Sequence, residues 1–244
     1  MQRLEREREL TQRLEALGRL AGGVAHDLNN LLTPVMGHTE LIRLEPELSP
    51  TVRESSEQIA AAAQRAADLV QQLLTFARRD TDKPTELDLD SVVRDFAPLL
   101  QKLLPGNIGI KLQLHCGDRK MRGYRLHIEQ ILMNLVVNAR DAMPDGGTIR
   151  IETKAVELDA AQCSEHAGLT PGRYLRLAVA DEGVGMTPEV QARLFEPFFT
   201  TKAVGRGTGL GLATIHGIVQ RAGGHVLVQS EPGRGSTFEA LLPV

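Results

Sequence analysis

Tryptophan is absent from this chain of 244 residues, and all aromatic residues together make up 3% of it. So low an aromatic content argues against the stacking platforms that bind single-stranded nucleic acid. The formal net charge of −3 provides no broad basic field either, because acidic residues are interspersed with the arginine-rich stretches. We therefore expect no nucleic-acid partner.

Cysteines and long apolar segments are also scarce. Cys116 and Cys163 are the only cysteines, and neither lies in a CxxC pair or a His/Cys cluster. A disulfide framework or a zinc site is therefore not expected, and a reducing compartment fits. No run approaches the roughly 20 apolar residues of a membrane helix, and the charged N-terminus does not resemble a signal peptide. These absences predict a cytoplasmic chain without a membrane segment.

The N-terminal third carries a heptad pattern. Apolar residues recur every seven positions in two companion seams, one at Leu14, Ala21, Leu28, Val35 and Ile42, the other at Leu10, Leu17, Val24 and Leu31. This spacing predicts a long helix with one apolar stripe. Ser49 followed by Pro50 is typical of a helix start and predicts a second helix after a short loop. Its own stripe runs through Val52, Ile59, Ala66 and Leu73.

Two helices with one apolar stripe each bury little surface alone. A two-fold homodimer that forms a four-helix bundle is the simplest solution, and a monomeric hairpin packed on a second domain is the alternative. Residues 80–85 have the composition of a linker. We accordingly expect a helical hairpin over residues 1–82 and a separate domain over residues 83–244.

The second domain mixes strands and helices. Strands are expected at 108–114, 148–156, 173–180, 225–229 and 236–242, and helices at about 126–143 and 210–222. Helices interleaved with mostly antiparallel strands indicate a two-layer α/β sandwich. The predicted fold class of the whole chain is therefore α+β.

Three polar residues share one face of the first of these helices. Asn134, Asn138 and Asp141 fall at i, i+4 and i+7 among apolar neighbours. Carboxamide oxygens are hard ligands that suit Mg²⁺. A solvated helix face is the alternative for this segment taken alone.

Three further segments follow along the chain. Residues 181–186 follow a strand and have the sequence Asp-Glu-Gly-Val-Gly-Met. The Asp could accept a hydrogen bond from an exocyclic amine, and the glycines would let the backbone approach a ring closely. Residues 195–202 hold three phenylalanines before a Thr-Thr-Lys, and residues 205–212 form a glycine-rich entry to a helix, which suits phosphates. The alternatives are an ordinary turn, a small satellite core and a lid without ligand. Neither a Walker A loop nor a dinucleotide fingerprint is present.

In order and spacing, these four segments resemble the N, G1, F and G2 boxes of the GHKL ATPase superfamily, as found in histidine kinases, which has the Bergerat fold. Residues 233–238 are similar to its closing GxGSTF element, so the resemblance covers residues 85–244. It implies a site for ATP and Mg²⁺ in which Asp181 recognises adenine N6 and Asn138 is the principal Mg²⁺ ligand. Asn134 would lie close to the metal and the phosphates, which Lys202 would approach. The other positions placed around the nucleotide are Asp141, Gly183, Gly185, Phe199, Thr201, Gly205, Gly207, Thr208, Gly209, Leu210 and Gly211. An Asp that commonly precedes the N box is replaced here by residues 123–125, Gly-Tyr-Arg, a position we regard as structural.

His26 falls outside the heptad seam and is expected to face solvent, with Asn30 one turn further on the same face. Gly22, Gly23 and Pro34 weaken the helix around it. A neutral imidazole is a nucleophile at cellular pH, and Asp27 could accept its Nδ1 proton. A solvated surface histidine is the alternative for this residue taken alone.

Residues 18–34 resemble the H box of the HisKA dimerisation and phosphotransfer domain. The resemblance implies that His26 is the phosphoacceptor, that Asp27 is an acid/base, and that Asn30 can orient a water that dephosphorylates the partner. The whole chain then resembles the core of a sensor histidine kinase, which phosphorylates His26 with ATP and passes the phosphoryl group to an Asp of a response-regulator receiver domain. A GHKL ATPase that drives conformational change is the alternative, although such relatives use a Glu where Asn134 stands, and a scaffold that only binds nucleotide is a third possibility.

Overall fold

The structure is a computed structural model that describes residues 28, 30–45, 48–77, 83–164, 169–202 and 208–244. Contacts divide the chain into two compact units, Met1–Thr81 and Asp82–Val244. The heptad seams before residue 28 lie outside the described residues. Within the described part, no helix combines the length and the apolar character needed to cross a bilayer.

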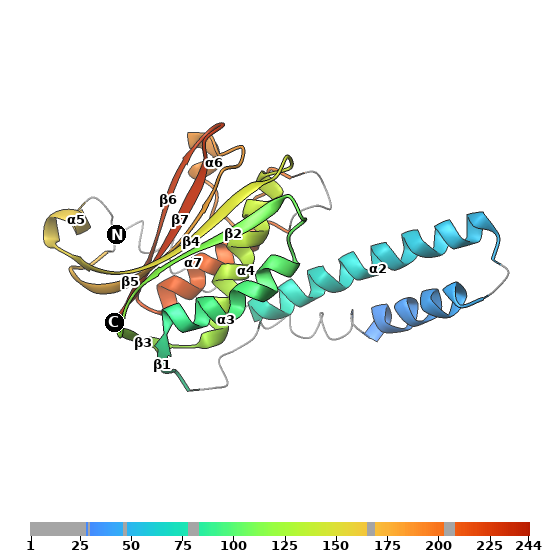
Figure 1. Ribbon diagram of the computed structural model, residues 1–244, viewed down its shortest axis with the longest axis horizontal. Coiled ribbons are helices and arrows are strands. Elements are labelled where there is room, and N and C mark those ends of the chain that lie inside the picture. The colour runs from blue at the N-terminus through green and yellow to red at the C-terminus, as the bar shows by residue number, and fades with distance from the viewer. Residues whose placement is uncertain (1–27, 29, 46–47, 78–82, 165–168, 203–207) are drawn as a thin grey trace. The chain divides into compact units, whose positions relative to one another are not determined.

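The first unit is a helical hairpin, as the sequence predicts. Residues 30–43 are helical, and helix α2 spans Pro50–Ala77 (Figure 1). The backbone N–H of Val52 donates to the Ser49 hydroxyl at 3.4 Å, which is the capping contact expected at this helix start. The two helices meet at small polar residues, because the hydroxyl of buried Ser56 donates to the carbonyl oxygen of buried Thr39 at 3.2 Å.

The apolar stripes of this hairpin are left uncovered within one chain. The exposed fractions are 40% for Val35, 38% for Ile42, 45% for Val52 and 49% for Ile59. The hairpin therefore buries its small residues and presents its branched apolar residues on the surface. A surface of this kind is typical of a protein interface.

The second unit is built on a five-stranded sheet in the order β2-β4-β5-β7-β6. All neighbouring strands pair antiparallel except β2 and β4, which are parallel. A separate two-stranded antiparallel ribbon joins β1 to β3. The strand bounds are Thr85–Asp88 for β1, Ile108–His115 for β2, Lys120–Gly123 for β3, Gly147–Leu158 for β4, Gly172–Asp181 for β5, His225–Glu231 for β6 and Gly235–Pro243 for β7.

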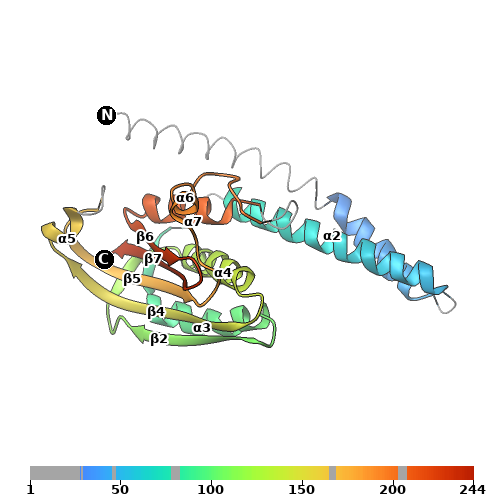
Figure 2. The same ribbon diagram turned by 90° about the horizontal axis from the view of Figure 1, so that it is seen from above.

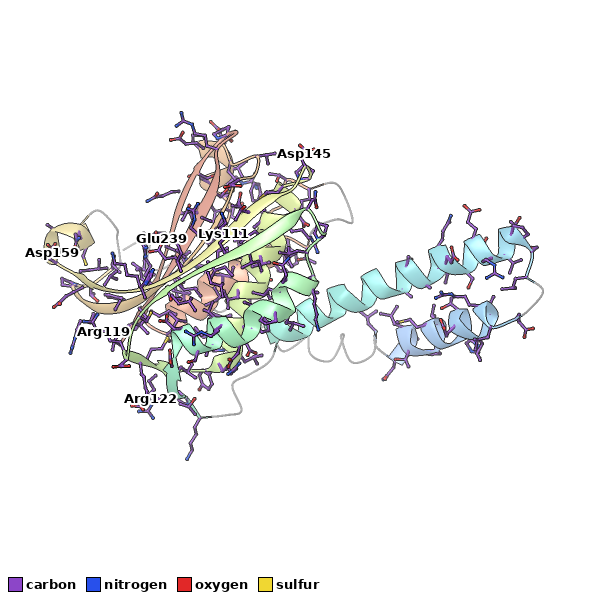
Figure 3. The ribbon with its side chains drawn as sticks, in the orientation of Figure 1. Lys111, Arg119, Arg122, Asp145, Asp159 and Glu239 are labelled. Atoms are coloured by element: carbon purple, nitrogen blue, oxygen red, sulfur yellow. The ribbon has the colours of Figure 1, made fainter. Side chains whose placement is uncertain are left out.

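Three helices cover one face of this sheet, as Figures 1 and 2 show: α3 (Leu89–Lys102), α4 (Arg125–Ala142) and α7 (Gly211–Arg221). The short helices α5 (Ala160–Ser164) and α6 (Pro188–Gln191) lie outside this layer. The core between the layers joins Ile131 of α4 to Ile151 and Leu177 of the sheet, all with no exposed surface. Strand alternation turns charged side chains such as Lys111 and Glu239 to the opposite face (Figure 3). The unit is therefore a two-layer α/β sandwich, and the predicted α+β class is confirmed.

A buried carboxylate ties α3 to the sheet. Asp90 Oδ1 accepts a hydrogen bond from the Thr153 hydroxyl at 2.5 Å, and its Oδ2 accepts one from the Cys116 backbone N–H at 3.0 Å. Burial is the main cause that raises the pKa of the Cys116 thiol to about 12, so this cysteine stays protonated. The network is a structural link and not a reactive site.

Candidate active site

The face of α4 expected to hold metal and phosphate is formed as its spacing requires. Asn134 and Asn138 are partly buried on this face, one turn apart, and Asp141 follows in the last turn of the helix. Ile131 and Leu135 lie on the buried side against the sheet. The sheet therefore fixes the helix, and the helix fixes the three polar side chains.

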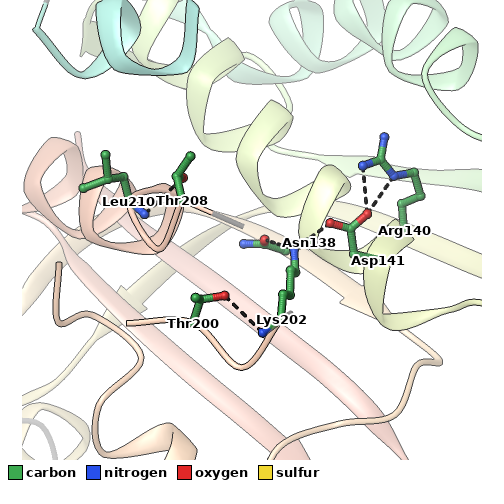
Figure 4. Close-up of polar contacts among 7 residues, drawn as sticks. All are labelled: Asn138, Arg140, Asp141, Thr200, Lys202, Thr208 and Leu210. Carbon is green, nitrogen blue, oxygen red and sulfur yellow. Dashed lines mark hydrogen bonds and ion pairs between the residues drawn. The ribbon is translucent and has the colours of Figure 1, made fainter. Parts of the chain in front are cut away.

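Lys202 brings the segment after the three phenylalanines onto this face (Figure 4). Its ammonium donates to Asp141 Oδ2 at 2.6 Å and to Asn138 Oδ1 at 3.3 Å. The Lys202 backbone N–H donates to the Thr200 hydroxyl at 3.2 Å. The guanidinium of Arg140 pairs with the other oxygen of Asp141, at 2.9 Å from Nε and 2.8 Å from Nη2. A positive charge thus lies at the position where the sequence predicts a cation.

Asp181 lies at the end of β5 with one carboxylate oxygen fixed by the backbone. Its Oδ1 accepts from the N–H of Gly183 at 2.9 Å and from the N–H of Ser236 at 3.2 Å. Both bonds use Oδ1, which leaves Oδ2 for a donor such as an exocyclic amine. Burial raises the pKa of Asp181, and the two backbone bonds oppose that rise.

The loop after Asp181 packs tightly because of its glycines. The N–H of Val184 donates to the carbonyl oxygen of Ala142 at 3.0 Å, which joins the loop to the end of α4. A Cβ on Gly183 would lie 2.6 Å from that same oxygen. Gly185 has φ +66°, and a Cβ there would lie 2.0 Å from the carbonyl oxygen of Glu231. Only glycine fits at either position.

The glycine-rich segment meets both α4 and the phenylalanines. The N–H of Phe198 donates to the carbonyl oxygen of Gly209 at 2.9 Å. A Cβ built on Gly211, the first residue of α7, would lie 3.3 Å from Asn134 Oδ1. The N-terminus of α7, where the first N–H groups of a helix have no acceptor within the helix, therefore opens beside the polar face of α4.

Other residues expected at the site have defined surroundings. The Arg193 guanidinium lies 4.3 Å from the centre of the Phe199 ring, and Thr201 is exposed. The N–H of buried Leu210 donates to the Thr208 hydroxyl at 3.3 Å. His26, Asp27, Gly205 and Gly207 lie outside the described residues. Asn30 is an exposed residue of the helix at 30–43, in the first unit.

The donor set on α4 suits magnesium bound together with a nucleotide. The two amide oxygens are hard ligands, and Asn138 Oδ1 already accepts from the cationic Lys202. In the described part of the chain, no group of three or more His, Cys, Asp or Glu side chains could hold a metal. Mg²⁺ is commonly held by one or two protein oxygens plus substrate phosphates, so the small donor set fits that use.

Two contributors are not predicted from the sequence. Ser236 holds Asp181 through its backbone, and the GxGSTF resemblance indicates no role for this residue. Arg140 fixes the Asp141 carboxylate, and no pattern in the sequence distinguishes it from an exposed arginine. Both roles depend on contacts between distant or side-by-side residues that spacing does not show.

Comparison with known proteins fits this geometry. Residues 123–244, half of the chain, match the family described as histidine kinase-, DNA gyrase B- and HSP90-like ATPase. Residues 16–82 match the His Kinase A (phospho-acceptor) domain. The chain belongs to the histidine kinase family. It carries the two domains of a histidine kinase catalytic core, as the resemblance implies.

Individual relatives extend along nearly the whole chain. Sensor kinase CckA of Brucella abortus is 40% identical over 240 residues, which cover 98% of this chain and 25% of CckA. Full-length ShkA, solved with AMPPNP, has a TM-score of 0.70 at 23% identity and covers 92% of this chain and 45% of that one. The histidine kinase ThkA, solved with the response regulator TrrA, has a TM-score of 0.61 at 24% identity. The match covers 99% of this chain and 66% of that one. The chain spans between a quarter and a half of the length of the curated relatives it matches.

Proposed function

We propose that this chain transfers the γ-phosphoryl group of ATP to His26 and then to an aspartate of a response-regulator receiver domain. One observation carries the proposal: the face of α4, Asp181 and the N-terminus of α7 converge in a chain whose other domain matches a phospho-acceptor family over His26. The convergence supplies groups for adenine and phosphates, and the match supplies an acceptor. No group in the described part of the second unit needs to react covalently.

The residues divide the work by their chemistry. Asp181 Oδ2 would accept from adenine N6, and Gly183 and Gly185 would let the ring lie against the backbone. The N–H groups at the start of α7, together with Lys202, would bind the phosphates. When bound at Asn138 and Asn134, Mg²⁺ would offset phosphate charge during in-line transfer. His26 would supply the nucleophilic imidazole nitrogen and Asp27 would hold the proton on the other one.

The partners follow from the same proposal. The uncovered stripe through Val35, Ile42, Val52 and Ile59 suits the seam of a four-helix bundle in a homodimer. A receiver domain is the expected acceptor, and the similar kinase ThkA forms a complex with the response regulator protein TrrA. We also propose a cytoplasmic location, which suits both the use of ATP and two cysteines that are buried and unpaired.

Incubation with ATP labelled at the γ-phosphate separates this proposal from its alternatives. Label on the protein that is acid-labile, stable in alkali and absent from His26→Ala supports the histidine kinase. Free phosphate without labelled protein would support an ATPase that drives conformational change. Nucleotide binding with neither product would support a scaffold. The Asn134 amide in place of a water-activating carboxylate favours the first outcome.

Asn30 supports a second activity of the same domain. It is exposed on the helix at 30–43, within the segment that matches the phospho-acceptor family. An amide in this place could orient the water that attacks the phosphorylated aspartate of the regulator. Asn30→Ala should then slow the decay of the phosphorylated regulator in the presence of the kinase and leave autophosphorylation unchanged. An unchanged decay rate would remove the phosphatase role.

A further inference from the structure

We propose that the Lys202 ammonium is an internal placeholder for the metal, and that Asp141 is a positioning residue that holds it there until Mg²⁺ and nucleotide arrive. The inference rests on the proposed nucleotide site and adds to it a competition built into the chain. The main observation is that the Lys202 ammonium donates two hydrogen bonds, one to Asp141 Oδ2 at 2.6 Å and one to Asn138 Oδ1 at 3.3 Å (Figure 4). Asp141 would then oppose nucleotide binding instead of contributing to it.

Neighbouring groups hold the Asp141 carboxylate and the Lys202 backbone in place. Arg140 binds Asp141 Oδ1 through Nε and Nη2, so the carboxylate presents Oδ2 in one direction. The Lys202 backbone N–H is bound to the Thr200 hydroxyl, while the four-carbon side chain is free to change rotamer. When the ammonium leaves, Asp141 keeps its contacts with Arg140. Opening the pair therefore leaves no carboxylate without a partner.

The ammonium and a magnesium ion would compete for the same place. Mg²⁺ ligated by Asn138 Oδ1 would lie about 2.1 Å from that oxygen. The ammonium lies 3.3 Å from the same oxygen, so both together would bring two positive charges into contact in a partly buried site. The phosphates give Lys202 a new anionic partner. We infer that Mg²⁺–nucleotide binding moves Lys202 from Asp141 to the phosphates.

When a closed state must open before binding, the apparent dissociation constant equals the intrinsic one divided by the fraction of molecules that are open. The Lys202 and Asp141 side chains are 31% and 24% exposed, so their pairing is only modestly stabilising. Asp141→Asn removes the carboxylate, keeps the shape, and is expected to tighten Mg²⁺–nucleotide binding by roughly two- to fivefold. A carboxylate that helped to bind the metal would give the opposite result.

The experiment is a titration of a fluorescent ATP analogue into wild type and Asp141→Asn, once with excess Mg²⁺ and once with a chelator. Asp145→Asn is the matched control. Asp145 is exposed in the turn between α4 and β4 (Figure 3), and its substitution changes the net charge by the same amount as Asp141→Asn. Displacement by the metal predicts a larger tightening with Mg²⁺ than with chelator. Simple relief of charge repulsion predicts the reverse, because the metal-free nucleotide is more negative.

A second arm asks whether the effect runs through Lys202. In a Lys202→Met background, Asp141→Asn should change the affinity by less than half of its effect in the wild type. Thermal unfolding of each variant shows that it folds, and Asp141→Glu, which keeps the charge, should bind within twofold of the wild type.

The outcomes separate this inference from the proposed function. Tightening by Asp141→Asn that needs both Mg²⁺ and Lys202 supports the placeholder. Equal or weaker binding by a folded Asp141→Asn, or equal tightening by Asp145→Asn, overturns it while the nucleotide site stands. If the wild type binds no ATP analogue under either condition, the proposed function fails first and the placeholder fails with it.

Discussion

The N–H of Phe198 donates a 2.9 Å hydrogen bond to the carbonyl oxygen of Gly209, and both residues have positive φ angles, 67° for Phe198 and 64° for Gly209. This bond closes a loop that carries Lys202 and the glycine-rich segment. The ends of the loop are thereby fixed to each other beside α4.

Gly209→Ala tests this closure. A Cβ at residue 209 would lie 2.3 Å from the carbonyl carbon of Phe198, so the substitution must break the contact as well as strain φ. Strain of this kind costs about 1–3 kcal/mol, and we expect nucleotide affinity to fall roughly tenfold. Gly117→Ala is the control, because Gly117 has φ +62° but open space around its Cβ position. Equal affinity losses in both variants would refute the closure.

Asp181→Asn should separate stability from binding. Burial raises the pKa of Asp181, and a carboxyl with a raised folded-state pKa stabilises the fold only while it is protonated. That contribution is complete below the unfolded pKa near 4 and is lost as the pH rises through the higher folded pKa. The ionised side chain therefore costs stability at pH 7.

The neutral variant keeps an oxygen for the N–H groups of Gly183 and Ser236. We expect its melting temperature at pH 7 to exceed that of the wild type by about 2 °C, with the difference shrinking toward pH 4. Affinity for ATP should fall at least tenfold, because an amide nitrogen can replace the acceptor for adenine N6. Asp118→Asn, at an exposed position, is the control for net charge. If the variant melts at a lower temperature than the wild type at pH 7, the ionised Asp181 side chain does not destabilise the fold as predicted.

Thr153→Val tests the buried link between α3 and the sheet. Thr153 has no exposed surface, and its hydroxyl is one of two donors to the Asp90 carboxylate. Hydrogen bonds to charged groups contribute about 1.5–3 kcal/mol, and the free energy of unfolding should fall by that amount in denaturant titrations. Thr148→Val on the same strand should cost less than about 0.5 kcal/mol. Similar losses in the two variants would show that Asp90 finds another donor.

Ile59→Glu tests the homodimer. Ile59 is 49% exposed in the single chain and lies on the apolar stripe of α2. A charge in the proposed seam should raise the dimer dissociation constant at least a hundredfold, seen as monomers in sedimentation velocity, because charged side chains are not buried unpaired. Arg53→Glu changes the charge at an exposed position away from the stripe and should stay dimeric. Monomeric wild type at micromolar concentrations would refute the four-helix bundle.

Much of the fold follows from local patterns in the sequence. The helix expected at 126–143 is observed as Arg125–Ala142, and the strand expected at 173–180 as Gly172–Asp181. These elements have strong periodicity, and a glycine or proline stands two residues after the end of each. The sequence prediction lacks α3, although the buried Leu89, Val92 and Leu100 are spaced for a helix, because Pro98 interrupts the pattern. It also lacks the ribbon of β1 and β3, whose four-residue strands are too short for alternation to be visible.

Contacts between distant segments could not be predicted in this way. The parallel pairing of β2 with β4 is one, because the intervening β3 and α4 decide the direction in which the chain returns. The Lys202–Asp141 pair is another, since 61 residues separate its members and their spacing carries no signal. The resemblance to the GHKL boxes places both residues around the nucleotide, whereas in the structure they are bound to each other. Local chemistry thus predicts the elements and the donors, and tertiary packing decides which donors meet.

The most direct test of the account is to locate the phosphoryl group after incubation with Mg²⁺ and ATP, by mass spectrometry of peptides kept at alkaline pH. We predict phosphate on the imidazole of His26, and its loss in Asn138→Ala, which keeps His26 but removes the proposed metal ligand. Phosphate on another residue, or unchanged labelling of Asn138→Ala, would contradict the proposed transfer.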